Sequence, residues 1–337
     1  MTTLWNTLLA TDTLEHLGDP AGEVRAARDA TVISPLADLA CLQATGEDAA
    51  DFLHNLLTND VKGLAPDAVQ RAGFCTPKGR LLADFLVWHG NNGLLLQTSA
   101  ELQPAMLKKL SMYILRAKAK LADAGSTLAI IGLAGRGAES LLAGLGASVP
   151  EPMRLSRFEH GSVIGLGPLR FQIVVPAEQA AALWQKLSAT ARPVGLAAWR
   201  WLDIAAGIPH IAPQTQELFV PQMVNFELVG GIGFKKGCYP GQEIVARTQY
   251  LGKIKKRMWR AALADGATIT ASPGSPLYAP STGDQVCGNV VNVAPSPEGG
   301  SELLVVVPED VAQAGQIHLG AVDGPQLQLL ALPYALS

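Results

Sequence analysis

The residues best suited to chemistry lie in one window of the chain, from Phe234 to Arg260. It holds eight Lys or Arg side chains and one acidic residue, Glu243, so its net charge is +7. The whole chain carries −3, which leaves −10 for the remainder. A local positive charge in an acidic chain favours an anionic ligand. From charge alone, the alternative is a solvated, lysine-rich connection between domains.

A single cysteine, Cys238, stands near the start of this window. We predict a helix from Pro240 to Arg247, because proline is tolerated in the first turn of a helix. The free N–H groups and positive dipole of that helix end would favour a thiolate. Gln242 and Glu243 add an amide and a carboxylate. The alternative is a buried structural cysteine, and a Cys–His pair would need a histidine brought close by folding.

Hydrophobic patterning predicts the elements that surround this window. Three strands of a β-meander are followed by a helix and by a half-buried strand with a basic face. The predicted ranges are strands at 69–76, 80–88 and 94–98, a helix at 100–111, and the basic-faced strand at 115–121.

Residues 127–190 have the order strand, helix, strand, strand, helix, which is typical of a ferredoxin-like α+β unit. A helix is predicted at 194–206. From about residue 257 onward, short apolar runs are separated by Pro, Gly and Ser, which indicates an all-β domain, a sandwich or a barrel. The chain is therefore expected to be of the α+β class.

The composition of the chain excludes several classes of protein. The chain has 337 residues, of which 48% are hydrophobic and 16% charged, so it is neither disordered nor a bulk polycation. No run is long and apolar enough to span a membrane, and no signal peptide is visible, so we expect a cytoplasmic protein without a membrane partner. The four cysteines and six histidines are scattered, so we expect no disulfide scaffold and no metal site.

The octapeptide from Lys236 to Glu243, KGCYPGQE, resembles the signature of the YgfZ family, relatives of the glycine cleavage T-protein, an aminomethyltransferase. Shorter segments support this resemblance over about residues 35–260. They are Phe52-Leu53, Leu57-Thr58-Asn59-Asp60, Ala206-Gly207-Ile208-Pro209, Pro221-Gln222-Met223-Val224-Asn225, Ala246-Arg247 and Tyr250-Leu251-Gly252.

The resemblance implies a three-domain cloverleaf around a site for tetrahydrofolate or a derivative. The implied domains are a folate-binding core at 1–125 plus 194–250, a ferredoxin-like domain at 126–193 and a C-terminal β-barrel at 251–337. It also implies a role in assembling or repairing iron–sulfur clusters in particular enzymes, with an indirect effect on tRNA modification. The expected partners are folate and iron–sulfur enzymes or assembly proteins.

These arguments select the residues that we expect in the functional site. Cys238 is the expected functional thiol. The expected folate-binding residues are Asp84, Asp203, Gln222, Asn225, Lys236, Gln242, Glu243 and Arg247. Lys253, Lys255 and Lys256 are expected to bind the anionic glutamate tail of folate through charge-assisted hydrogen bonds.

Two departures from the relatives bear on the chemistry. The aminomethyltransferases carry paired acids where this chain has Ala83 and Asp84, and loss of one acid argues against methylene transfer. Many relatives also carry Glu where this chain has Ala205. Asp203 would replace that carboxylate in an extended segment, whereas in a helix it is rotated about 200° away.

We therefore expect a folate-binding accessory protein without classical turnover. One alternative is a tetrahydrofolate-dependent aminomethyl- or methyltransferase. The other is a tRNA-binding module that uses the basic window, which would bind less tightly as salt increases. The acidic remainder of the chain makes direct nucleic-acid binding the weaker alternative.

Overall fold

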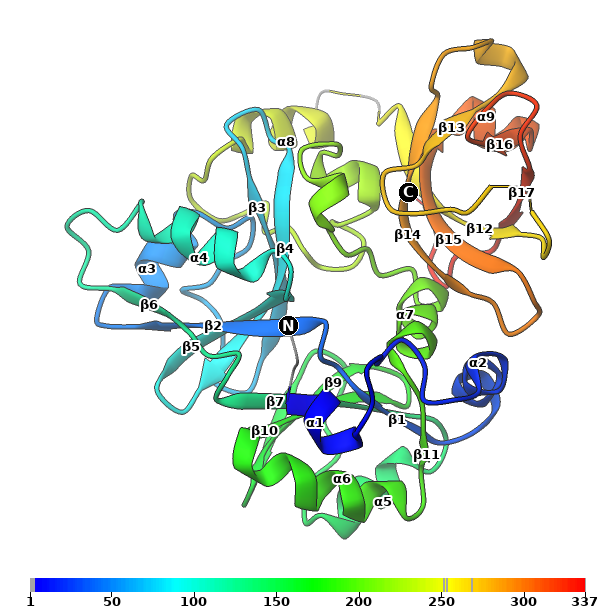
Figure 1. Cartoon of the computed structure of the whole chain (residues 1–337). Helices are drawn as coiled ribbons and strands as arrows, with labels where there is room; N and C mark the ends of the chain where they lie inside the picture. Colours follow the sequence, from blue (N-terminus) through cyan, green and yellow to red (C-terminus); the bar gives the residue numbers. More distant parts are fainter. Residues whose placement is uncertain (1–3, 251, 253, 268, 337) are drawn as a thin grey trace. The chain divides into compact units, whose positions relative to one another are not determined.

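A computed structural model describes residues 4–250, 252, 254–267 and 269–336. The fold is mixed helix and strand, with a six-stranded sheet, a five-stranded sheet and a closed barrel, which confirms the predicted α+β class (Figure 1). The chain divides into two compact units. Unit 1 comprises Met1–Leu53, Val61–Gln70 and Phe85–Trp199, and unit 2 comprises His54–Asp60, Arg71–Asp84 and Arg200–Ser337.

The six-stranded sheet of unit 1 has the order β11-β1-β7-β10-β9-β8. Its strands are β1 (Val32–Pro35), β7 (Leu128–Ala134), β8 (Leu155–Phe158), β9 (Gly161–Gly167), β10 (Arg170–Pro176) and β11 (Arg192–Pro193). Helices α5 (Ala138–Gly144) and α6 (Ala180–Ser188) lie together along one side of this sheet (Figure 1). The predicted order of strands and helices at 127–190 is confirmed, with β8 as an added strand. The three predicted domain boundaries stay a prediction.

The five-stranded sheet has the order β3-β4-β5-β2-β6. Its strands are β2 (Leu39–Thr45), β3 (Val69–Cys75), β4 (Leu81–Gly90), β5 (Gly93–Ser99) and β6 (Lys120–Asp123). The predicted meander of β3, β4 and β5 is confirmed. The helices of this region are α3 (Ala49–His54) and α4 (Gln103–Ser111).

The predicted strand at 115–121 is wrong in its first part, because β6 begins only at Lys120. The backbone of Lys118 is hydrogen-bonded to Asp48 and not to a neighbouring strand. Its N–H donates to Asp48 Oδ2 at 2.7 Å, and its carbonyl accepts from the N–H of Asp48 at 3.3 Å. These bonds to the segment before α3 replace the strand ladder at that position.

The chain before β1 forms two helices, α1 (Leu4–Leu9) and α2 (Pro20–Asp29), where the sequence pattern is weak. Asp19 caps α2 by accepting from the N–H of Gly22 at 3.0 Å. Glu23 is buried and accepts the N–H of Gly195 at 2.8 Å, so a carboxylate anchors this helix together with its buried apolar residues Val24, Ala26 and Ala27.

In unit 2, the C-terminal strands form a closed barrel with the order β12-β15-β14-β13-β16-β17, which confirms the predicted barrel. The strands are β12 (Lys256–Leu263), β13 (Pro276–Tyr278), β14 (Gly288–Pro295), β15 (Ser301–Pro308), β16 (Ile317–Leu319) and β17 (Gln326–Leu330), with helix α9 (Glu309–Ala314). Alternate residues of β12 and β15 pack inward, and the barrel core includes Ala261, Leu303, Val305 and Val307.

Two further helices bound the segments that carry most predicted site residues, α7 (Leu196–Ala205) and α8 (Gln242–Tyr250). Between them the chain forms short 3-10 turns, which include Pro213–Thr215 and Pro221–Val224. Both predicted helices are confirmed, although α8 begins at Gln242 and not at Pro240. In the described part of the chain, no helix combines the length and apolar character needed to cross a bilayer.

Candidate functional site

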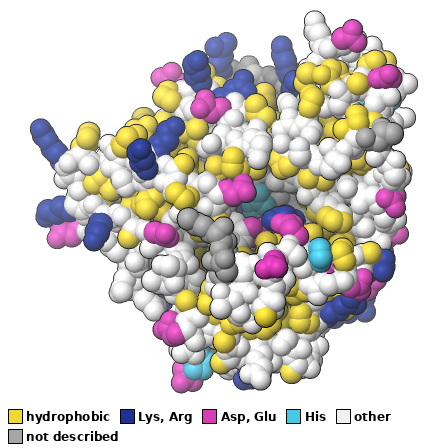
Figure 2. Space-filling view, viewed as in Figure 1, with side chains coloured by type: hydrophobic (Ala, Val, Ile, Leu, Met, Phe, Trp, Pro, Cys, Tyr) yellow, Lys and Arg dark blue, Asp and Glu magenta, His cyan; other side chains and the backbone are white. Residues whose placement is uncertain are grey.

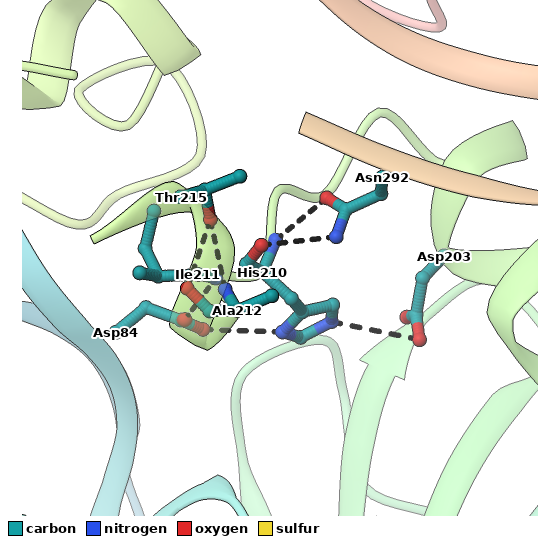
Figure 3. Close-up of polar contacts among 7 residues, drawn as sticks. All are labelled: Asp84, Asp203, His210, Ile211, Ala212, Thr215 and Asn292. Carbon is teal, nitrogen blue, oxygen red and sulfur yellow. Dashed lines mark hydrogen bonds and ion pairs between the residues drawn. The ribbon is translucent and has the colours of Figure 1, made fainter. Parts of the chain in front are cut away.

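Two of the predicted carboxylates meet at one histidine in unit 2 (Figure 3). Asp84 Oδ2 lies 3.1 Å from His210 Nδ1, and Asp203 Oδ2 lies 3.5 Å from His210 Nε2. The side chain of His210 is 34% exposed, whereas those of Asp84 and Asp203 are 11% and 14% exposed. We call these three residues the carboxylate–histidine cluster.

The backbone around His210 is fixed by side chains from distant parts of unit 2. Asn292 of β14 accepts the His210 N–H at 2.9 Å and donates to the His210 carbonyl at the same distance. Asp84 Oδ1 accepts the N–H of Ile211 at 2.7 Å, and Thr215 accepts the N–H of Ala212 at 2.9 Å (Figure 3). The imidazole is therefore presented from a rigid turn.

The cluster favours a charged imidazole. Burial opposes the charged form, but the hydrogen bonds and negative charges of Asp203 and Asp84 outweigh it and raise the pKa of His210 to about 10. At neutral pH the cluster thus holds one positive and two negative charges. Such a proton is held too tightly for efficient acid catalysis near pH 7. The arrangement is suited to binding a ligand rich in N–H donors.

Asp203 lies on α7, so the helical alternative for this segment is the one realised. Its carboxylate contacts His210 and does not take the place of the side chain missing at Ala205. The sequence analysis did not select His210. The signal for it was its position directly after the Gly207-Ile208-Pro209 segment, in a loop whose prolines restrict the backbone.

Cys238 lies exposed in the loop that precedes α8. Gly241, with φ of +80°, ends this loop, and a Cβ there would lie 2.5 Å from the Thr76 carbonyl oxygen. Only glycine fits such a close backbone approach without strain. Thr76 is itself held, because its carbonyl accepts the N–H of Gly79 at 2.9 Å. The thiol therefore sits on an anchored loop, as the prediction of an accessible cysteine requires.

Lys236 is half-buried two residues before the thiol. Its ammonium donates to the carbonyl oxygens of His54 and Leu57, the latter at 2.5 Å, and lies 4.9 Å from the centre of the Tyr239 ring. Burial lowers the pKa of Lys236 to about 8, although the charges of Asp60 and Cys238 oppose this shift. This predicted folate-binding lysine thus makes contacts within the protein.

Gln222 and Asn225 are fully buried. Asn225 donates to the Met258 carbonyl at 2.8 Å, and Gln222 donates to the Val245 carbonyl at 2.7 Å. Gln222 Oε1 is buried and accepts no hydrogen bond within the described residues. Asn225 therefore holds the start of β12, whereas Gln222 keeps one acceptor available to a donor.

The basic residues gather around α8 and the beginning of β12. Glu243 and Arg247 are exposed on α8, and Gln242 is half-buried at its first position. Figure 2 shows Lys and Arg side chains along the upper edge of the face in view, where α8 lies in Figure 1. Lys255 and Lys256 line an open groove of about 570 Å³.

Two acidic residues, Glu309 and Asp310 of α9, line the same groove and reduce its positive potential. Lys253, the third predicted tail-binding lysine, lies outside the described residues. Among the residues that the structure describes, no group of three His, Cys, Asp or Glu side chains is placed to hold a metal ion.

Comparisons with known proteins show similarity in sequence and in fold. The family model of the GCVT N-terminal domain matches residues 18–229. The chain is 31% identical over 307 residues to the tRNA-modifying protein YgfZ of Vibrio vulnificus (strain YJ016), covering 90% of this chain and 92% of that protein. It is 28% identical over 326 residues to the protein of the same name from Escherichia coli (strain K12 / DH10B), covering 94% and 97%.

Among solved structures, the fold is similar to the glycine cleavage system aminomethyltransferase T of Bartonella henselae. The TM-score is 0.76 at 16% sequence identity, over 94% of this chain and 90% of that one. At this identity the similarity establishes the fold.

Proposed function

Because the chain belongs to the YgfZ family, we propose that it is a folate-binding accessory protein that supports iron–sulfur enzymes and, through them, tRNA modification. The observation that carries the folate part is the carboxylate–histidine cluster. Its two carboxylates and one imidazolium, with a partly exposed edge, offer a net negative surface. A few fixed, convergent polar groups are typical of small-molecule sites.

A reduced pterin ring fits this donor and acceptor set. The ring presents an amino group and several ring N–H groups, and the carboxylate of Asp203 supplies acceptors beside the partly exposed imidazole. The glutamate tail of a folate is anionic, and Lys255 and Lys256 supply cations. A bound reduced folate would supply a carrier for a one-carbon unit. This chain's own contribution is to bind and orient that molecule.

The contacts of Asp84 favour an accessory role over aminomethyl transfer. Asp84 Oδ1 accepts the Ile211 N–H and Oδ2 faces His210, so both carboxylate oxygens have partners within the protein. The residue before it is Ala83, which carries no second carboxylate. An acid with both oxygens engaged is poorly placed to handle a proton on a substrate.

The iron–sulfur part of the proposal rests on the family and on the exposed thiol of Cys238. An accessible thiol is the group in this chain that is able to exchange sulfur or electrons with a client enzyme. The three other cysteines are buried. Burial raises the pKa of Cys41 and of Cys75 to about 12, which disfavours their thiolates.

Calorimetric titration tests the folate part. Tetrahydrofolate and its 5-formyl derivative are titrated into the wild type and into Asp203→Asn, with Asp265→Asn as a control that removes one exposed carboxylate outside the proposed site. We expect saturable binding by the wild type, a loss of about tenfold or more in Asp203→Asn, and less change in the control. Absence of binding by the wild type to either folate would overturn the proposal.

Complementation tests the iron–sulfur part. A deletion strain of a bacterium that carries a relative is supplied with the wild type, Cys238→Ser or Cys287→Ser, the last being a buried cysteine of the barrel. Iron–sulfur enzyme activity and modified tRNA nucleosides are measured. We expect recovery with the wild type and Cys287→Ser only. Full recovery with Cys238→Ser would exclude a chemical role for that thiol.

A further inference from the structure

The loop that carries Cys238 is held by one short segment of unit 2, residues 54–60. Thr58 Oγ1 donates to the Gly231 carbonyl at 2.6 Å, and the Gly233 N–H donates to the Thr58 carbonyl at 2.9 Å. Asn59 Nδ2 donates to the Gly230 carbonyl at 2.8 Å. The Leu57–Asp60 segment, which supports the family resemblance, thus fixes the path of the cysteine loop through these hydrogen bonds.

The same segment presents a histidine to that loop. A Cβ built on Gly237, the residue directly before the thiol, would lie 3.6 Å from His54 Nε2. His54 Nδ1 lies 3.0 Å from Asp60 Oδ1, close enough for an ion pair but without hydrogen-bond alignment. The side chain of His54 is only 13% exposed. With the ring proton on Nδ1 beside the carboxylate, Nε2 has a lone pair directed toward the loop.

Cys238 follows Gly237 by one Cα–Cα step of about 3.8 Å. Its thiol is therefore one residue away from the point where His54 Nε2 approaches the loop, and a Cys–His pair needs a base near the sulfur in this way. Two lysines adjoin it. Lys236 interacts electrostatically with the Cys238 thiolate, and Lys235 is exposed. Folding has thus brought a proton acceptor from a distant part of the sequence to a thiol that two lysines precede in the chain.

We propose that Cys238 is a mixed-disulfide site for an anionic low-molecular-weight disulfide, with His54 Nε2 as the acceptor of the thiol proton. The inference rests on the proposed function only in taking Cys238 as the functional thiol. The Cys238 sulfur attacks one sulfur of R–S–S–R. A Cys238–S–S–R bond forms as the R–S–S–R bond breaks, and the second sulfur leaves as a thiolate.

The step balances in protons and electrons. The thiol proton passes to His54 Nε2 and then to the departing thiolate, which is released as R–SH. Oxidation of Cys238 is matched by reduction of the leaving sulfur. Because Cys41, Cys75 and Cys287 are buried, no second accessible thiol among the described cysteines resolves the product. The mixed disulfide therefore persists until an external thiol removes it.

Oxidised glutathione is the probe. The full chain is incubated with it at pH 7.5, and the mass gain is followed over time and located by peptide mapping. We expect one adduct on Cys238, none in Cys238→Ser, and a rate reduced about tenfold or more in His54→Gln. His160→Gln, which changes an exposed histidine of unit 1, serves as the matched control and should react like the wild type. Equal rates in His54→Gln and the wild type would overturn the proposal.

A second condition separates proton transfer from a merely structural role of His54. In alkaline solution hydroxide takes over the role of a protein base, Lys236 is neutral in both proteins, and the rates of wild type and His54→Gln should converge. A persistent difference under these conditions would mean that His54 only shapes the loop. If His54→Gln unfolds, Asp60→Asn tests the same pair, with a smaller loss expected.

The preference for an anionic disulfide has its own readout. Cystamine, a cationic disulfide, should react more slowly than oxidised glutathione, and Lys235→Gln should reduce that difference. An unchanged ratio would overturn the charge preference. The folate titration is run on the same variants, and we expect His54→Gln to bind folate like the wild type. Failure of the thiol proposal and failure of folate binding are thus observed separately.

Discussion

His210 Nδ1 lies 3.1 Å from Asp84 Oδ2, although the two residues are 126 positions apart in the chain. This contact joins strand β4 to the loop after α7. Two neighbouring hydrogen bonds strengthen this junction. The side-chain Nε2 of Gln216 donates to the Leu82 carbonyl at 2.7 Å, and the Glu217 N–H donates to the Leu81 carbonyl at 2.8 Å. The cluster is therefore part of the framework of unit 2 as well as a binding surface.

The first prediction concerns stability against pH. The pKa of His210 is raised to about 10 in the folded protein, from an ordinary value of 6.5. The folded state therefore keeps a proton that the unfolded chain loses as pH rises above about 6.5. The stabilisation from His210 is complete below about pH 6.5 and is lost as pH rises toward about 10.

Urea unfolding at pH 6, 8 and 10 checks this dependence. The difference in unfolding free energy between the wild type and His210→Gln should be largest at pH 6 and should shrink at each higher pH. Contributions from Lys236 and the tyrosines cancel in this difference. His160→Gln should show no such trend, and a constant difference for His210→Gln would mean that the imidazole is neutral in the fold.

The two carboxylates of the cluster should differ in their effect on stability. Asp84→Asn removes the charge from a buried acceptor of two hydrogen bonds and should cost about 2–4 kcal/mol. Asp203→Asn acts at the longer contact of 3.5 Å and should cost about 1 kcal/mol. Chemical denaturation of both variants at pH 7 measures the two losses. A larger loss in Asp203→Asn would reverse the assignment of Asp84 as the framework carboxylate.

The elements with strong alternation were predictable from local pattern. Strands β3, β4 and β5, the order of elements from β7 to α6 and the barrel all depend on apolar periodicity that is visible within a few residues. Helix α2 was not predicted, because Glu23, a charged residue, is buried where an apolar residue would be expected. The strand at β6 was predicted too long, because the contact of Lys118 with Asp48 is not local.

The site was predictable only in part, for a related reason. The window around Cys238 carries its charge and glycines in one continuous stretch, so the sequence alone predicted an accessible thiol before a helix. His54 and His210 act across long separations, and no local pattern distinguishes them from other histidines. Asn225 shows the opposite situation. Its motif made it stand out as a folate-binding residue, and in the structure its side-chain amide is hydrogen-bonded to the Met258 backbone.

A third prediction concerns the basic groove. Lys255→Gln together with Lys256→Gln should weaken binding of polyglutamylated tetrahydrofolate more than that of the monoglutamate, because only the longer tail brings added negative charge. Glu309 and Asp310 share the groove, so we expect a modest loss of about three- to tenfold. Calorimetry at two salt concentrations measures it. Lys108→Gln with Lys109→Gln, an adjacent pair at the end of α4, is the control. Equal losses for both folates would mean that these lysines do not contact the tail.

The fourth prediction compares two glycines of the cysteine loop that share a left-handed backbone. Gly230 has φ of +76° with open space around its Cα, whereas Gly241 has φ of +80° and faces the Thr76 carbonyl oxygen. Gly230→Ala should cost about 1–2 kcal/mol from backbone strain alone. Gly241→Ala adds a steric overlap with that oxygen at 2.5 Å and should cost about 3 kcal/mol or more. Urea denaturation gives both values, and similar losses in the two variants would show that the turn at Thr76 moves easily and does not anchor the thiol loop.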